Sequence, residues 1–320
     1  MEQAIYTAVY RDGQREYALG ELDGILDRAG IDYIPLKGAV IRELYPESWM
    51  RTSCDIDILV HEDDALSAVA ALEAAGYTHL ADTSTHDYSL SAPSGVHIEL
   101  HYTLSQDGAV KSADPVLGRV WDTSRAAKGR RWELSGETVI FYHLAHMAKH
   151  LIRGGCGVRP FVDLWLMENK LSFDRGRLEE MLGEGELKEF YAEALRLSRV
   201  WMENLPHTRT SSMLEEYVLC GGAYGTASNA AMTQAAGGGS RLAYFWRLMF
   251  LPRENLQVIY PSLKNHPALA PLYQVRRWLR VLRRDKRQRL RALTQARSSV
   301  TPQQSQTAAE LMNALGLTDK

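Results

Sequence analysis

The chain has 320 residues, of which 45% are hydrophobic and 24% are charged, and 37 basic residues nearly balance 39 acidic ones. This ordinary globular composition excludes a disordered chain, and no apolar run is long enough for a membrane helix. The three cysteines are widely spaced and lack metal-ligand spacing, and the N-terminal residues lack the basic start and apolar core of a signal peptide. We therefore expect a cytoplasmic protein with free thiols that is long enough for two domains.

The first predicted elements alternate between helices and strands. Apolar residues at helical spacing predict a helix that ends at Gly30, and IDYIPL predicts a short strand after it. AVIRELY predicts a helix ended by Pro46, and SCDIDILV predicts the second strand. Residues 62–75 predict a third helix, and YTHLA, DYSLSA and VHIELHYTL predict three more strands. This order predicts an α/β (α+β) domain with a small mixed sheet over residues 1–111.

The remainder of the chain has helical patterns. SGETVIFYHLAHMAKHLIRGG and RPFVDLWLMENK predict two helices, and further helical spacing follows in residues 177–204 and 211–220. AAGGGS at residues 235–240 predicts a flexible joint. We therefore expect an all-helical C-terminal part, divided into a helical domain over residues 112–235 and a helical tail over residues 236–320. The tail contains a basic helix, and we expect its last twenty or so residues to fray.

Two carboxylates interrupt the second predicted strand. Because strand side chains alternate between faces, Asp55 and Asp57 share one face and repel each other unless a cation compensates them. In the later strand VHIELHY, Glu99 is a third carboxylate. Lys37-Gly38 ends the strand before them and leads into a helix, a pattern that offers backbone N–H groups and a lysine to a phosphate. Together these features predict a two-metal phosphoryl-transfer site, in which metal charge compensates the carboxylates.

Three motifs, LKG, R-x-x-C-DID-x-LV and GVHIELHY, together resemble the nucleotidyltransferase superfamily, which has the DNA polymerase beta fold. Within it, the chain resembles the bacterial group of uncharacterised nucleotidyltransferases, and the likeness extends over most of the sequence. The resemblance implies transfer of a nucleoside monophosphate from a nucleoside triphosphate such as ATP to an acceptor, with release of pyrophosphate. It implies Asp55, Asp57 and Glu99 as catalytic ligands of two Mg²⁺ or Mn²⁺ ions.

The nucleotide contacts that we expect come from the residues around the first two strands, namely Lys37, Gly38, Arg51 and Ser53. The superfamily usually has Gly-Ser or Gly-Gly at the strand end, whereas Ala39 follows Gly38 here. Lys37 either replaces the missing serine hydroxyl at the triphosphate or is a surface cation. Arg51 either contacts phosphate or pairs with nearby acidic residues.

Five histidines are candidates for lining the cleft, and they are His97, His101, His143, His146 and His150. The first two flank Glu99 on its strand face, where hydrogen-bonded strand histidines are the alternative. The other three lie in one stripe of a predicted helix. The i, i+4 spacing of His146 and His150 would also suit zinc, but no glutamate follows His146 and no cysteine is near. The sequence therefore favours a cleft wall over a zinc site.

An acidic residue, Asp163, lies inside the apolar helix RPFVDLWLMENK. A buried carboxylate needs a partner if its burial is to be tolerated. We expect Arg159 or one of the helix histidines to be that partner.

The sequence does not identify the acceptor of the nucleotide. A small molecule, a protein and RNA are the three candidates. From Val275 to Arg297 nearly every polar side chain other than Gln and Thr is Arg or Lys. This basic helix either docks on its own domain or forms a surface for RNA or another acidic acceptor. Two alternatives accompany the main prediction: a toxin-like enzyme that adds nucleotides to RNA, and a catalytically silent module that binds a nucleotide or nucleic acid.

Overall fold

The computed structural model describes residues 2–80, 86–105, 108–221, 229, 232, 250–251, 256, 260, 263, 266–281 and 301–318. The chain divides into two compact units, Met1–Ala145 with Asp163–Glu186, and His146–Val162 with Leu187–Lys320. The predicted domain boundaries at residues 111 and 235 stay predictions. In the part that the structure describes, none of the helices is both long and apolar enough to span a membrane.

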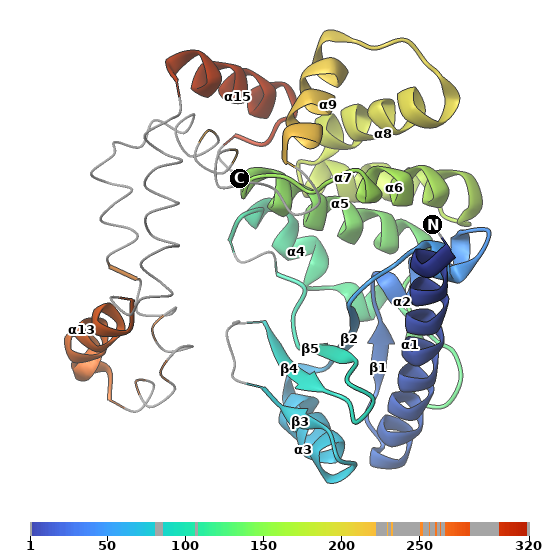
Figure 1. The fold of residues 1–320 in the computed structure, drawn as a ribbon, viewed down its shortest axis with the longest axis vertical. Helices are drawn as coiled ribbons and strands as arrows, with labels where there is room; N and C mark the ends of the chain where they lie inside the picture. Colours follow the sequence, from blue (N-terminus) through green and yellow to red (C-terminus); the bar gives the residue numbers. More distant parts are fainter. Residues whose placement is uncertain are drawn as a thin grey trace. The chain divides into compact units, whose positions relative to one another are not determined.

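The N-terminal elements of the first unit follow the predicted order (Figure 1). They are α1 (Glu2–Ala29), β1 (Tyr33–Pro35), α2 (Gly38–Ile41), the 3-10 turns η1 (Arg42–Leu44), η2 (Ser48–Met50) and η3 (Glu62–Asp64), β2 (Asp55–Val60), α3 (Ala65–Ala74), β3 (Thr78–His79), β4 (Asp87–Ser91) and β5 (His97–His101). Gly30 has φ 71° and Gly76 has φ 93°. Only glycine adopts this backbone region without strain, so these two residues end α1 and α3 as predicted.

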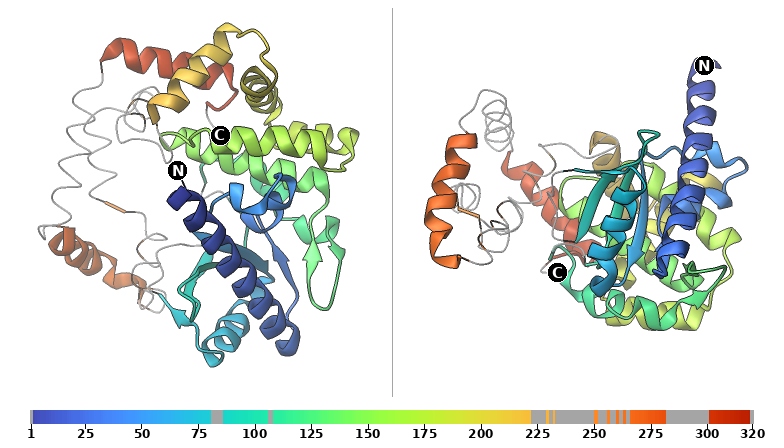
Figure 2. Two further views of the ribbon diagram at one scale, coloured as in Figure 1. Left: turned by 45° about the vertical axis from the view of Figure 1, so that its right-hand side comes forward. Right: turned by 90° about the horizontal axis from the view of Figure 1, so that it is seen from below.

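The five strands form one mixed sheet in the order β1-β2-β5-β4-β3. β2 and β5 are parallel, while β1 pairs with β2 and β4 pairs with β5 antiparallel. Helices α1 and α3 pack together in a core with one face of the sheet (Figure 2). The β2 and β5 residues in this core are Ile56, Ile58, Val60, Ile98 and Leu100. Because strand side chains alternate, Asp57 and Glu99 belong to the other face.

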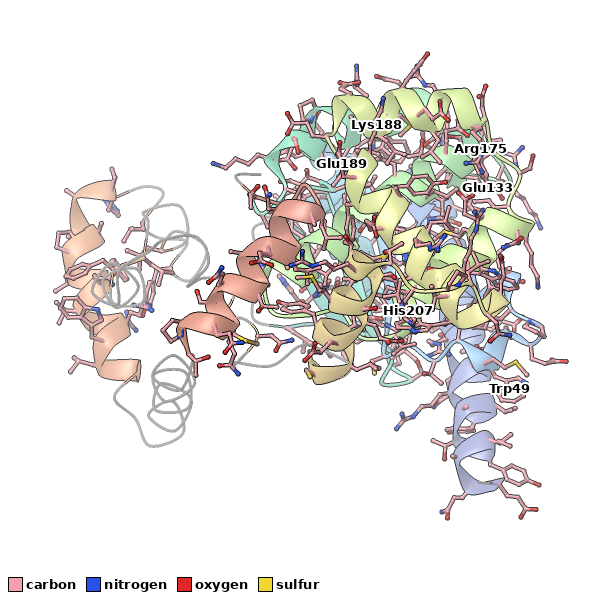
Figure 3. All side chains as sticks on the ribbon, turned by 90° about the horizontal axis from the view of Figure 1, so that it is seen from above. Trp49, Glu133, Arg175, Lys188, Glu189 and His207 are labelled. Carbon is pink, nitrogen blue, oxygen red and sulfur yellow. The ribbon has the colours of Figure 1, made fainter. Side chains whose placement is uncertain are left out.

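The rest of the first unit contains elements that the sequence patterns missed. These are α4 (Asp114–Leu117) with the 3-10 turns η4 (Lys111–Ala113) and η5 (Val120–Thr123), and a small hairpin of β6 (Arg125–Ala126) and β7 (Trp132–Glu133). Two-residue strands and one-turn helices are too short to show a periodicity. The long helices were predicted: α7 (Arg175–Glu184) lies in the first unit, whereas α5 (Gly136–Ile152) and α6 (Arg159–Lys170) each contribute residues to both units. η2, which carries Trp49, packs beside α1 (Figure 3).

The second unit is helical where it is described, as predicted. Its helices are α8 (Lys188–Glu203), α9 (Arg209–Gly221), η7 (Pro267–Leu269), α13 (Ala270–Val281) and α15 (Pro302–Ala314). Helix α13 contains the start of the predicted basic helix, whereas Arg283, Arg284, Arg287 and the joint at residues 235–240 lie outside the described residues.

The prediction that the last twenty residues fray is wrong, because α15 is a capped and packed helix. The Thr301 hydroxyl accepts a hydrogen bond from the Gln304 backbone N–H, and the Gln304 side chain accepts one from the Thr301 backbone N–H. This capping box satisfies N–H groups that a helix end otherwise leaves without partners. Leu311 and Met312 are buried, and α15 packs on α9. An apolar stripe within a largely polar sequence therefore holds the helix in place.

Candidate functional site

The register of β2 and β5 brings two of the predicted carboxylates side by side. Asp57 pairs with Glu99 across the parallel ladder, and Asp55 pairs with His97. Residues paired in this way point to the same face of a sheet. Asp57 and Glu99 therefore share one face of the sheet, on the side away from the apolar core.

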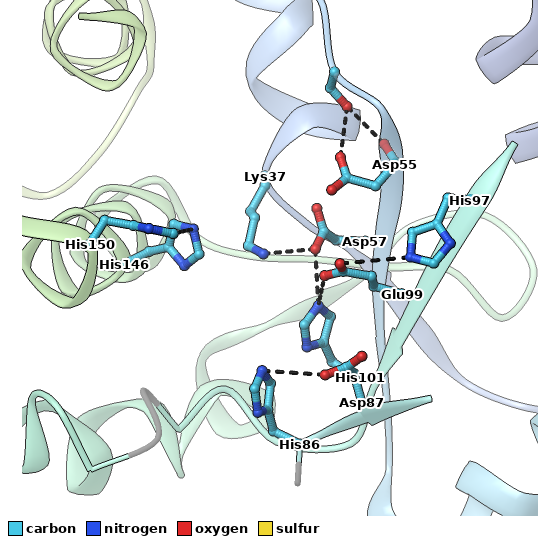
Figure 4. A network of polar contacts seen from close by, with 11 residues as sticks. Lys37, Asp55, Asp57, His86, Asp87, His97, Glu99, His101, His146 and His150 are labelled. Carbon is cyan, nitrogen blue, oxygen red and sulfur yellow. Dashed lines mark hydrogen bonds and ion pairs between the residues drawn. The ribbon is translucent and has the colours of Figure 1, made fainter. Parts of the chain in front are cut away.

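A compact polar cluster surrounds Asp57 (Figure 4). The Lys37 Nζ atom lies 2.7 Å from Asp57 Oδ1, and the His101 Nε2 atom lies 3.0 Å from the same oxygen. His101 Nε2 is also 3.5 Å from Glu99 Oε2, and His97 Nε2 is 3.9 Å from Glu99 Oε1. The Asp57 side chain is only 4% exposed. Lys37 and His101 are thus the cationic groups that compensate this buried carboxylate.

The electrostatics of the cluster favour its charged forms. Burial alone would raise the pKa of Asp57, but the Lys37 charge and the His101 hydrogen bond outweigh it and hold that pKa well below its usual range. Burial would lower the pKa of Lys37, but interactions with Tyr142 and Asp57 raise it instead. Burial raises the pKa of Tyr142 to about 12, so its phenol is neutral at pH 7 and Asp57 is the anion that holds Lys37 charged. Burial also opposes the charge of His101, yet hydrogen bonds that its ring donates to the carboxylates of Asp57 and Glu99 raise its pKa.

The cluster has a donor set that fits a divalent cation. Asp57, Glu99 and His101 each offer one ligand atom, and these atoms lie within 4.8 Å of one another. The two carboxylates suit Mg²⁺ through oxygen, whereas His101 could add a nitrogen ligand for Mn²⁺ only after it loses its proton. Asp55 is not in this group; its carboxylate accepts a hydrogen bond of 3.0 Å from Ser53 Oγ. Sequence reasoning named His101 only as a cleft-lining candidate, although its place two residues after Glu99 puts it on the same strand face.

A small pocket lies beside the carboxylates, at the turn between β1 and α2. It is lined by Arg15, Leu19, Gly38, Ala39, Arg42, Arg51, Ser53, Asp55 and Ile56. A Cβ atom on Gly38 would lie 2.9 Å from Arg51 Nη1 and 3.3 Å from Ser53 Oγ, so a larger residue would close the approach to both groups. Lys37 has φ 40°, a backbone conformation that is strained for a residue with a side chain. Such strain is common at binding sites, because the surrounding structure must hold it in place.

Arg51 is held by a buried ion pair. Its Nε and Nη2 atoms each donate a hydrogen bond of 2.9 Å to Asp163, and the Tyr45 hydroxyl donates one of 2.8 Å to the same carboxylate. The prediction that Arg159 or a helix histidine pairs with Asp163 is therefore wrong. The actual partner precedes β2 and is 112 residues away in the sequence, a separation that no local pattern reveals.

The three helix histidines do not belong to the described metal-ligand groups. His143 is buried in the first unit. His146 and His150 belong to the second unit, where their Nε2 atoms are 2.9 Å apart. Among the described residues, the sets of three possible metal ligands include neither of them, so the zinc alternative gains no third ligand. Their role in lining a cleft stays a prediction.

The mixed sheet presents Asp57 and Glu99 from two parallel strands, and Lys37 of the Lys37-Gly38 turn pairs with Asp57. The chain belongs to the family described as uncharacterised nucleotidyltransferase, which matches residues 1–203. No curated protein matches the chain. The match ends where α8 ends, and it contains every predicted site residue. Family membership supports a transferase activity with a nucleoside triphosphate as substrate.

The pairing of Lys37 with Asp57 corrects the interpretation of Lys37 as a surface cation and leads to a stability prediction. We expect Lys37→Met to lower the free energy of unfolding by about 2 to 3 kcal/mol, because it leaves a buried carboxylate with His101 as its described partner. Urea denaturation at pH 7 measures the change. Lys111→Met is the control, because Lys111 is exposed and its loss should change stability by less than about 0.5 kcal/mol. Equal stabilities of the two variants would contradict the buried pair.

Proposed function

We propose that the protein is a metal-dependent nucleotidyltransferase that moves a nucleoside monophosphate from a nucleoside triphosphate to an acceptor. The acceptor oxygen forms a bond to the α-phosphorus, the bond to the β-phosphate oxygen breaks, and pyrophosphate leaves. The observation that carries this proposal is the register of Asp57 with Glu99, joined by His101 within ligand distance, in a chain of this family. Asp55, Asp57 and Glu99 would hold two Mg²⁺ or Mn²⁺ ions.

The roles of the carboxylates follow from their environment. When bound there, Mg²⁺ or Mn²⁺ would stabilise negative charge on the transferring phosphoryl group. Lys37 and His101 keep Asp57 ionised, so a ligand carboxylate is ready without loss of a proton. Asp55 is oriented by Ser53, whose hydroxyl also donates to the Asp55 backbone oxygen at 2.8 Å. The protein thus prepares the charge of Asp57 and the direction of Asp55.

The residues around the pocket at Gly38 are the proposed contacts of the triphosphate. Ala39 cannot supply the hydroxyl that the superfamily usually has at this turn, but Ser53 Oγ lies against Gly38 from the neighbouring segment. Arg51 Nη1 approaches the same glycine, and Arg15 and Arg42, whose guanidinium groups pair with Asp12, line the pocket as well. Arginines in a partly dry pocket bind phosphate oxygens strongly. We therefore assign the triphosphate to Gly38, Ser53 and Arg51, with Lys37 between it and Asp57.

The cellular setting is part of the proposal. The described structure has three free cysteines, Cys54, Cys156 and Cys220, which suit the reducing cytoplasm. Acceptors in that compartment include small molecules, proteins and RNA.

Incubation with a cell extract tests the function and identifies the acceptor class. Purified protein is mixed with extract and, in turn, each α-labelled nucleoside triphosphate, and the products are treated with protease or ribonuclease. We expect label in one class of product, and its loss when a chelator removes divalent cations. Nucleotide binding without incorporation from any nucleoside triphosphate would instead support the catalytically silent alternative.

A further inference from the structure

Helix α1 buries one face in the described structure and exposes a row of tyrosines on the opposite face. The buried residues of α1 are Asp12, Arg15, Ala18, Leu22, Ile25 and Leu26. On the opposite side three tyrosines are exposed: Tyr6 by 78%, Tyr10 by 66% and Tyr17 by 64%. The first turns of α1 extend beyond the elements that cover the rest of the helix (Figures 2 and 3). An isolated helical segment of this length is marginal in water, so a contact on the exposed face would stabilise it.

The exposed face has an unusual composition for a solvent-facing helix surface. At 100° per residue, eight positions fall within an arc of roughly 80° that lies opposite the buried face. In chain order they are Glu2, Tyr6, Tyr10, Gly13, Tyr17, Gly20, Gly24 and Arg28, and we call them the outward stripe. Only its two ends are charged. Its interior consists of three tyrosines and three glycines, with the tyrosines mainly in the first half and the glycines mainly in the second.

The glycines of the outward stripe form notches. A Cβ atom on Gly13 or Gly20 would meet no described atom within 4 Å, so nothing in the described fold requires glycine there. Each glycine within a helix lowers stability by about 1 kcal/mol relative to alanine, which makes three on one face costly for a lone helix. A shallow hollow lined by Gly13, Glu16, Tyr17, Gly20 and Glu21 marks the middle of the stripe. Small residues of this kind allow a second helix to approach closely.

The order of residues in the outward stripe is self-complementary. When two copies of α1 run antiparallel with a two-fold axis near residue 15, every large or charged side chain meets a matching residue of the other copy. The resulting pairs are Glu2 with Arg28, Tyr6 with Gly24, Tyr10 with Gly20, and Gly13 with Tyr17. We propose that the protein forms a homodimer through this antiparallel pairing of the outward stripes of α1.

The size and chemistry of the stripe suit a second copy of this chain. The 28 residues of α1 are about 42 Å long. Because the tyrosines are 64% to 78% exposed, the six of them at about 150 to 250 Å² each would bury roughly 600 to 1,000 Å² on pairing, the size of a weak or transient interface. The same patch meets itself in such a dimer, as a two-fold interface requires. A partner of other sequence would not need the pairing of tyrosine with glycine along the whole helix.

The mass of the protein in solution tests the dimer. In sedimentation velocity between about 1 and 100 μM, we expect the full chain to reach twice its monomer mass. Tyr10→Glu and Tyr17→Glu should each stay monomeric, because they place charge in an apolar contact. Leu66→Glu is the matched control, because Leu66 is a 69% exposed apolar residue on α3 and its loss should leave the dimer intact. A wild-type monomer at every concentration would overturn the proposal.

Disulfide trapping tests the antiparallel register. Cys54 and Cys220, the exposed cysteines, are first replaced by serine. In this background we expect a mixture of the Tyr10→Cys and Gly20→Cys proteins to form a cross-linked dimer on mild oxidation, and neither protein alone to do so. Strong cross-linking of Tyr10→Cys with itself would indicate a parallel or differently aligned contact and would overturn the proposed register. Circular dichroism of each variant confirms that it is folded.

Discussion

Asp57→Asn should lower nucleotidyl transfer by on the order of a hundredfold or more. Asparagine keeps the shape of the side chain but removes the charge that Lys37 and His101 hold in place and that a divalent cation would need. Initial rates with the nucleotide and acceptor found in the extract experiment, at saturating Mg²⁺, measure the effect. The substitution should lower mainly kcat, because the cation that Asp57 would hold acts on the phosphoryl group during transfer.

Two controls separate this effect from damage to the fold. Asp63→Asn makes the same substitution at an exposed position in η3 and should leave the rate within about twofold. The melting temperature of Asp57→Asn shows whether the protein is folded at the assay temperature. A folded Asp57→Asn protein with the wild-type rate would contradict the assignment of Asp57 to the reaction.

Arg51→Met should have the largest effect on stability, a loss of about 3 to 5 kcal/mol. The substitution leaves Asp163, whose side chain is 1% exposed, as a buried charge without its bidentate partner. Urea denaturation at pH 7 measures the loss. The exposed pair of Arg177 with Glu180, 3.2 Å apart, is the matched comparison, and Arg177→Met should change stability by less than about 1 kcal/mol.

The double variant Arg51→Met with Asp163→Leu tests the cause of this loss. Removal of both charges leaves neither member of this pair buried alone, so we expect the double variant to recover most of the stability lost by Arg51→Met. If the double variant is as unstable as the sum of the two single variants, the ion pair is not the source of the effect. Because Arg51 also lines the Gly38 pocket, the double variant should still bind the nucleoside triphosphate more weakly than the wild type.

The strand pattern was sufficient to predict which side chains of β2 and β5 face away from the apolar core. The alternation of aspartates with isoleucines in β2 separates a polar face from an apolar face. The structure places Ile56 and Ile58 in the core. The same rule predicted that His97, Glu99 and His101 share a side. What the pattern did not contain was the pairing of β2 with β5, which sets Asp57 beside Glu99 and leaves Asp55 outside the described ligand group.

Contacts between distant segments account for what the sequence did not predict. Lys37 approaches Asp57 because β1 lies beside β2 in the sheet, whereas a lysine after a short strand shows no sign of burial in the sequence. Asp163 was expected to find a partner in its own region, but Arg51 reaches it from the segment before β2. The burial of α15 likewise depends on α9, about a hundred residues earlier in the chain.

The position of the label within the nucleoside triphosphate tests the central claim most directly. The protein is incubated with Mg²⁺, the acceptor fraction and a nucleoside triphosphate labelled on either the α- or the γ-phosphate. We expect the acceptor to gain the α-label, and the γ-label to leave as pyrophosphate. Transfer of the γ-label to the acceptor would show a kinase reaction and contradict the account. Release of the γ-label as orthophosphate, with no label on the acceptor, would show hydrolysis and would also contradict it.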